Sequence, residues 1–165
     1  MRWPWQRAGA EPSAGSDRRI LFPFIGSTVS QRTLEATLRL ARAQDATLVP
    51  AYLVVVPQHL SLESPAPVRD CDSALPVLEL IEQRAGRAGV PVDSRMERGR
   101  THRHALAELI AHERFDTLVI PARTSTSDGF EPSDVAWVLE NAPGEVLVLR
   151  PDAAPTAPRR SAAAT

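Results

Sequence analysis

Apolar and amphipathic stretches alternate through the middle of the chain. The strand-like stretches are short, and they are apolar either continuously or at about every second position, as expected for strands of a sheet. They cover residues 19–24, 47–56, 90–97, 116–121 and 145–151. Between them lie stretches with apolar residues at the three- and four-residue spacing of a helix. These cover residues 30–43, 74–89, 100–113 and 131–144.

This alternation predicts an α/β domain with a five-stranded parallel, doubly wound sheet and four helices. The stretch 90–97 is half polar and contains Pro91, which predicts a strand at an edge of the sheet. Residues 57–73 are predicted to form a long polar connection. Ligands of such sheets bind beyond the carboxyl ends of the strands. We therefore expect any site in the segments that follow Phe24 and Ile120.

The last predicted helix and strand suggest an interface. The apolar stripe of this helix is predicted to consist of Val135, Val138, Leu139 and Ala142. Trp137 lies off that stripe, so we expect it to be partly exposed. The closing strand is apolar, and an open edge of this kind needs protection from uncontrolled pairing. Trp137, Val146 and Val148 are therefore candidates for a homodimer interface. Packing of Trp137 under the C-terminal tail is the alternative.

Composition adds boundaries and excludes several classes of partner. Residues 1–17 and 152–165 are rich in small, polar and proline residues and are predicted to be disordered tails around a domain of residues 18–151. A formal net charge of −1 gives no reason to expect nucleic acid. Neither a signal peptide nor a membrane helix is predicted, because no apolar run is long enough. We expect a cytoplasmic protein.

Few residues suggest catalytic chemistry. All 19 basic residues are arginine, which excludes Schiff-base chemistry and the lysine of a Walker loop. His102 and His104 lie about 200° apart on the predicted helix and cannot bind one metal ion together. Cys71 stands between two aspartates, which disfavour a thiolate. The cluster Arg98, Arg100 and Arg103 is interpreted as either a solvated rim or a site for an acidic ligand. We expect no metal and no catalytic residue.

Three segments resemble the universal stress protein family, and the resemblance is to a member of the actinobacterial type. They are "ILFPFIGSTVSQRTLEATLRLARAQDATLVPAYLVVVP", "RMERGRTHRHALAELIAHERFDTLVIPA" and "VAWVLENAPGEVLVLRP". The resemblance covers roughly residues 18–151, and its last segment is the most specific. It implies an α/β sandwich with strand order 3-2-1-4-5. It also implies a dimer, often formed through the last strand, and in some members binding of ATP or AMP.

The glycine-rich motif of the ATP-binding members is not matched. Those members have G-x2-G-x9-G-[S/T] after the fourth strand and an Asp at the end of the first. Ser133 aligns with the final Ser, and Ile25 replaces the acid. The first two glycine positions fall on Val119 and Ala122 in one alignment of the loop and on Pro121 and Thr124 in the other, and neither alignment places a glycine at any of the three positions. Glycines allow close approach of main-chain N–H groups to phosphate, whereas Pro121 and Pro132 have no N–H. The residual pocket would contain Ile25, Gly26, Ser27, Thr124 and Ser133.

Three hypotheses follow. The preferred one is a non-enzymatic, dimeric stress-protein-like domain without a cofactor, which acts through contacts with another protein and has a degenerate nucleotide site. The second is a module that still binds ATP, AMP or a small anion through a rearranged loop. The third and least favoured is a hydrolase or nucleotidyl transferase on the same fold, because the sequence pairs no general base with a nucleophile or metal site.

Overall fold

The structure is a computed structural model that describes residues 17–63, 68–124 and 129–150. In these described segments, nine elements alternate in the order that the sequence predicts. The strands are β1 (Arg19–Phe24), β2 (Thr47–Val55), β3 (Arg95–Gly99), β4 (Thr117–Pro121) and β5 (Glu145–Leu149). The helices are α1 (Gln31–Ala43), α2 (Val68–Ala88), α3 (His102–His112) and α4 (Pro132–Asn141). Both predicted tails lie outside the described residues, except for Asp17.

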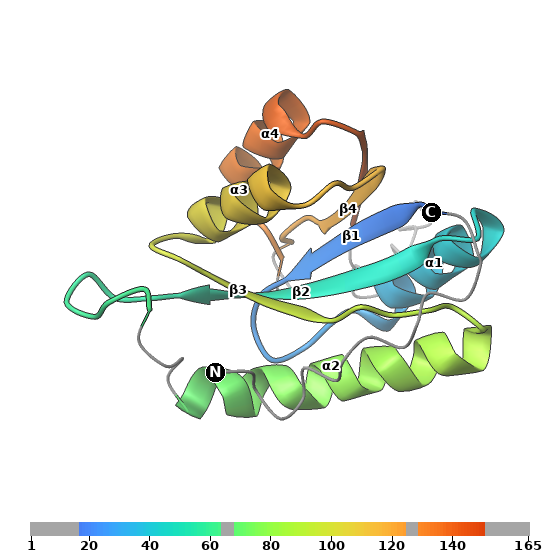
Figure 1. The fold of residues 1–165 in the computed structure, drawn as a ribbon, viewed down its shortest axis with the longest axis horizontal. Helices are drawn as coiled ribbons and strands as arrows, with labels where there is room; N and C mark the ends of the chain where they lie inside the picture. The colour runs from blue at the N-terminus through green and yellow to red at the C-terminus, as the bar shows by residue number, and fades with distance from the viewer. Residues whose placement is uncertain (1–16, 64–67, 125–128, 151–165) are drawn as a thin grey trace, which may run out of the picture.

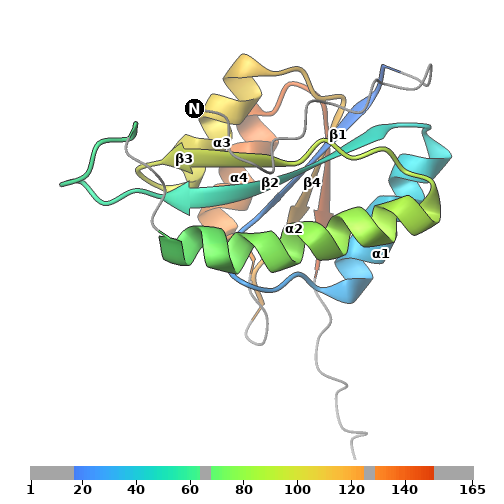
Figure 2. The same cartoon turned by 60° about the horizontal axis from the view of Figure 1, so that its bottom comes forward.

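All strands are parallel, in the order β3-β2-β1-β4-β5 (Figure 1). This confirms the predicted fold class. α1 and α2 cover one face of the sheet, and α3 and α4 cover the other (Figures 1 and 2). Each helix layer has its own apolar core, one around Phe22, Phe24 and Tyr52, the other around Leu21 and Leu106. None of the helices in the described segments is long and apolar enough to cross a membrane.

Pro50 and Pro76 lie inside regular elements. Pro50 is buried in β2 and pairs with Phe22. Proline has no N–H to donate. Position 50 lies between the Leu48–Val92 bridge and the first β2–β3 pair, Ala51–Arg95, where no hydrogen bond between the two strands is required. Pro76 lies inside α2, which begins at Val68 rather than at the predicted residue 74. The prediction was wrong because buried residues on both sides of Pro76, such as Ala74 and Val77, continue the apolar face of the helix.

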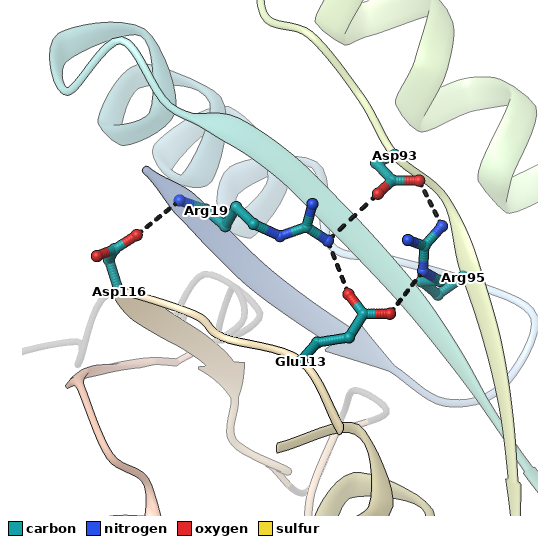
Figure 3. Close-up of polar contacts among 5 residues, drawn as sticks. All are labelled: Arg19, Asp93, Arg95, Glu113 and Asp116. Atoms are coloured by element: carbon teal, nitrogen blue, oxygen red, sulfur yellow. Dashed lines mark hydrogen bonds and ion pairs between the residues drawn. The ribbon is translucent and has the colours of Figure 1, made fainter. Parts of the chain in front are cut away.

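The amino ends of the strands are joined by four charged side chains that form a closed ring (Figure 3). Arg19 of β1 binds Asp93 and Glu113 at 3.2 and 2.7 Å, and Arg95 of β3 binds the same two carboxylates. The main-chain N–H of Arg19 also donates to Asp116. This ring connects β1, β3 and the end of α3 across β2, so it fixes the edge of the sheet that lies opposite the expected site.

Candidate functional site

The segments after β1 and β4 meet at the carboxyl edge of the sheet, where the sequence predicts a site. After β1, Ile25 is half-buried against the α3–α4 core, while Gly26 and Ser27 are exposed. Gly26 has a φ of 78°, a conformation that glycine adopts without strain. Ser30 accepts a hydrogen bond from Thr33 N–H and caps α1.

The connection from β4 to α4 folds back and binds itself. Arg123 N–H donates to the Phe130 carbonyl, and Phe130 N–H donates to the Pro121 carbonyl, both over 2.8 Å. These bonds form a small parallel bridge between Ala122 and Phe130. The N–H groups of Arg123 and Phe130 are therefore already occupied by partners in the same connection. Residues 125–127, which supply three of the hydroxyls of this segment, lie outside the described residues.

Gly129 and Phe130 explain why the connection can close so tightly. A Cβ atom on Gly129 would lie 2.7 Å from the carbonyl carbon of Ala122 and 2.7 Å from Arg123 N. The glycine therefore permits contact between two parts of the main chain. Phe130 follows with only 1% exposure, and its ring fills the core beneath α3 and α4. The sequence does not predict that Phe130 is buried, because a lone Phe in a polar loop has no periodic pattern around it.

Two arginines neutralise two carboxylates at the start of α4. Arg103 of α3 donates to Asp134 Oδ1 over 3.0 Å and to the Ser133 carbonyl over 3.1 Å. Arg123 forms an ion pair with Glu131, the residue that precedes α4. Carboxylates are favourable at the N-terminus of a helix because the helix dipole is positive there. The position that could attract an external anion thus already carries two internal ones.

His102 joins α3 to the same connection. Its ring lies edge-on to Phe130, with 6.5 Å between the ring centroids. Burial lowers the pKa of His102 below its ordinary value, and the negative charge of Asp134 opposes part of that shift. The net shift favours the neutral form of the imidazole.

The arginines at the end of β3 bind main-chain carbonyls. Arg100 donates to the carbonyls of Val56, Pro57 and Leu60, the shortest contact being 2.6 Å. Arg98 donates to the Leu62 carbonyl over 3.3 Å. These arginines brace the connection that leaves β2, which protrudes from the domain (Figure 2). The sequence suggested that this arginine cluster is either a solvated rim or a site for an acidic ligand. The contacts of Arg98 and Arg100 with main-chain carbonyls fit neither interpretation.

The other predicted site residues are placed as follows. Thr124 is half-buried at the last described position before residue 129, and Ser133 is exposed in the first turn of α4. Ser133 contributes its carbonyl to Arg103. Within the described residues, no group of three or more His, Cys, Asp or Glu side chains could hold a metal ion.

The candidate interface residues lie around β5. Val146, Val148 and Trp137 are half-buried and pack into the core under α4. Leu147 of β5 is 38% exposed, and Leu139 of α4 is 58% exposed. The prediction that Leu139 belongs to the buried stripe of α4 was wrong. The helix turns so that Asp134 meets Arg103 and Val138 is buried, and this carries Leu139 outward.

Comparison with known proteins agrees with this fold. The model of the universal stress protein family matches residues 17–150, and the chain belongs to that family. A universal stress protein family structure from Burkholderia pseudomallei is similar, at 22% identity and a TM-score of 0.60 over 79% of this chain and 94% of that one. So is an Arabidopsis thaliana member with AMP bound, at 18% identity and a TM-score of 0.60 over 82% and 93%.

A third similar structure is a universal stress protein in complex with cAMP. It is 22% identical, with a TM-score of 0.57, and the match covers 82% of this chain and 98% of that one. At these identities the structures support the fold rather than a shared ligand. No curated protein matched the chain.

Proposed function

We propose that this chain is a non-enzymatic, cytoplasmic universal stress protein whose nucleotide site is closed by its own residues. It would act in the stress response as a homodimer, through contacts with another protein. The observation that carries the proposal is the self-bonded connection between β4 and α4. Arg123 N–H and Phe130 N–H donate to carbonyls within that connection over 2.8 Å.

A phosphate group would need hydrogen-bond donors and positive charges that the connection between β4 and α4 already uses for its own contacts. Main-chain N–H groups that point outward from a glycine-rich loop bind phosphate oxygens. Pro121 and Pro132 have no N–H. The side chains of Arg103 and Arg123 are paired with Asp134 and Glu131. An incoming phosphate would therefore have to displace internal hydrogen bonds and would meet two carboxylates.

The two edges of the sheet support dimerisation through β5. β3 presents Arg95, Glu97 and Arg98 along its length, and charged residues at an edge oppose pairing with another strand. β5 has the sequence EVLVL and exposes Leu147. Pairing of two β5 strands would satisfy their open main-chain groups and bury Leu147. Residue 147 is a sharper probe than Val146 or Val148, which already pack into the core of their own subunit.

The second candidate function is a nucleotide-binding module. It is favoured by two similar structures, one in complex with cAMP and one with AMP bound. For this chain to bind in that way, the bridge between Ala122 and Phe130 would have to open. That opening exposes the Phe130 side chain, whose burial contributes roughly 1.5–3 kcal/mol.

Two experiments test the proposal. The purified protein is denatured and the released fraction is analysed by chromatography for adenine nucleotides. We expect none, and stoichiometric ATP, AMP or cAMP would support the second candidate instead. For the dimer, sedimentation velocity compares the wild type with Leu147→Lys and with Leu80→Lys, a matched control because Leu80 is 41% exposed on α2. We expect a dimer that only Leu147→Lys dissociates, and a monomeric wild type would refute the dimer.

A further inference from the structure

Two reciprocal contacts hold the first turn of α3 to the residues before it. Thr101 caps the helix by accepting a hydrogen bond from His104 N–H over 3.0 Å. The His104 ring reaches back, and its Nδ1 atom accepts from Arg100 N–H over 3.1 Å. Because a main-chain N–H can only donate, Nδ1 is the unprotonated ring nitrogen and Nε2 carries the hydrogen. In a capping box the third helical residue is Glu or Gln. Here it is a histidine, which titrates near neutral pH.

Arg100 also holds the segment that leaves β2. Its guanidinium donates to the carbonyls of Val56, Pro57 and Leu60. These carbonyls belong to residues 56–63, here called the β2 arm, which protrudes from the domain (Figure 2). The contact with His104 fixes the main chain from which this guanidinium extends. The order of the β2 arm is therefore coupled to the state of one imidazole.

A proton on Nδ1 of His104 is incompatible with the contact to Arg100. The charged ring carries a hydrogen on both nitrogens, so Nδ1–H would face Arg100 N–H, donor against donor. A positive charge is also unfavourable in the first turn of a helix, where the helix dipole is positive. We propose that His104 is an acid-sensitive switch, whose neutral ring holds Arg100 N–H and whose protonation releases Arg100 and loosens the β2 arm.

The charges nearest to His104 oppose this change only in part. Glu108 of α3 has Oε1 at 3.7 Å from Nε2, so it favours the charged ring. It shares its charge with His112, which lies 3.6 Å from its other oxygen, and it interacts electrostatically with Glu97 of β3. An exposed ion pair of this kind contributes little to stability. The guanidinium of Arg100 adds a second positive charge next to the same turn.

Charged groups on the other elements around α3 have partners of their own. Arg95 of β3 is paired with Glu113, and Asp134 of α4 is paired with Arg103. The β2 residues that share a core with α3 are apolar, namely Val49, Ala51 and Leu53. The acid response of this turn is therefore expected to come from His104 itself.

Amide hydrogen exchange, measured by NMR at pH 8 and pH 5 and corrected for the intrinsic effect of pH, tests the proposal. In the wild type, the protection of the Arg100 amide should fall about fivefold in acid, the effect of losing one hydrogen bond. The Leu60 amide, which donates to the Pro57 carbonyl within the β2 arm, should lose protection with it. The Val56 amide, which donates to the Gly99 carbonyl over 2.9 Å, should keep its protection.

Two variants isolate the imidazole. In His104→Gln the side-chain carbonyl can accept from Arg100 N–H at every pH, so the protection of Arg100 and Leu60 should no longer depend on acid. His112→Gln is the matched control, because it removes a histidine on the far side of Glu108 and should behave like the wild type. The ring nitrogen chemical shifts of His104 in the wild type supply a check that needs no variant, and they should show the hydrogen on Nε2 at pH 8.

Four results would overturn the inference. The first is a wild-type Arg100 amide that is equally protected at both pH values, and the second is a His104→Gln variant that loses protection in acid as the wild type does. The third is a loss at Arg100 without one at Leu60, which would separate the β2 arm from the switch. The fourth is an equal loss at Val56, which would indicate general unfolding instead of a local change.

Discussion

Arg103 and Asp134 join the first turns of α3 and α4 through a hydrogen-bonded ion pair of 3.0 Å. The same guanidinium reaches the Ser133 carbonyl, so a single side chain holds two elements that are 30 residues apart. Asp134 keeps only 19% of its side-chain surface exposed. This contact fixes the rotation of α4, and with it the outward position of Leu139.

Arg103→Ala is expected to lower the free energy of unfolding by about 1 kcal/mol, since a partly exposed ion pair contributes 1 kcal/mol at most and the carbonyl contact adds a hydrogen bond. Urea denaturation measures the change. Arg39→Ala, on the exposed side of α1, is the control and should change the value by less than about 0.5 kcal/mol. If Asp134→Asn and Arg103→Ala prove additive in a double-mutant cycle, the two side chains do not interact.

Gly129→Ala should destabilise the protein by about 1–3 kcal/mol, the usual cost of forcing atoms into a filled space. The new Cβ would lie 2.7 Å from the main chain at Ala122 and Arg123, which must separate. The matched control is Gly86→Ala in α2, where a Cβ meets nothing within 4 Å and a helix gains about 0.5–1 kcal/mol. Thermal denaturation should show a lower Tm than the wild type for Gly129→Ala and a higher Tm for Gly86→Ala. A stable Gly129→Ala variant would show that the connection does not close as described.

Acid should lower the free energy of unfolding, in part through His102. Burial lowers its folded-state pKa, so the folded state favours the neutral ring and binds fewer protons than the unfolded chain. The stabilising contribution is therefore present above the unfolded-state pKa near 6.5 and is lost as the pH falls below it. Urea midpoints between pH 8 and pH 5 should fall less steeply for His102→Gln than for the wild type. Parallel curves would exclude His102 as a source of the pH dependence.

Glu97 should act in the opposite sense. Burial raises its pKa, and the negative charges of Glu108 and Glu113 add to the shift, while Arg98 N–H and His112 oppose it. The raised value favours protonation in the folded state, so stability is lost as the pH rises through the folded-state pKa. Glu97→Gln keeps the acceptor for Arg98 N–H and should therefore be more stable than the wild type at pH 7. The comparison is repeated at pH 4, where the advantage should shrink.

The alternation of strands and helices follows from periodicity, because parallel strands buried on both faces are continuously apolar. The strand order was implied by the resemblance to the universal stress protein family. The start of α2 could not be predicted from periodicity. A proline such as Pro76 is typical of the first turn of a helix, but here buried residues on both sides of Pro76 continue the helix. Sequence also locates the edge of the sheet where a site belongs. It does not reveal that Phe130 fills the core or that Arg103 reaches Asp134. Both depend on how two distant helices pack, and no local pattern encodes that contact.

The account rests on a closed connection between β4 and α4, and calorimetric titration of the wild-type protein with ATP, AMP and cAMP tests it most directly. We predict no saturable heat at nucleotide concentrations up to about 1 mM, which corresponds to a binding free energy weaker than about −4 kcal/mol. A micromolar dissociation constant for any of the three nucleotides would contradict the account, because the Arg123 and Phe130 N–H groups could not then remain bonded within the connection.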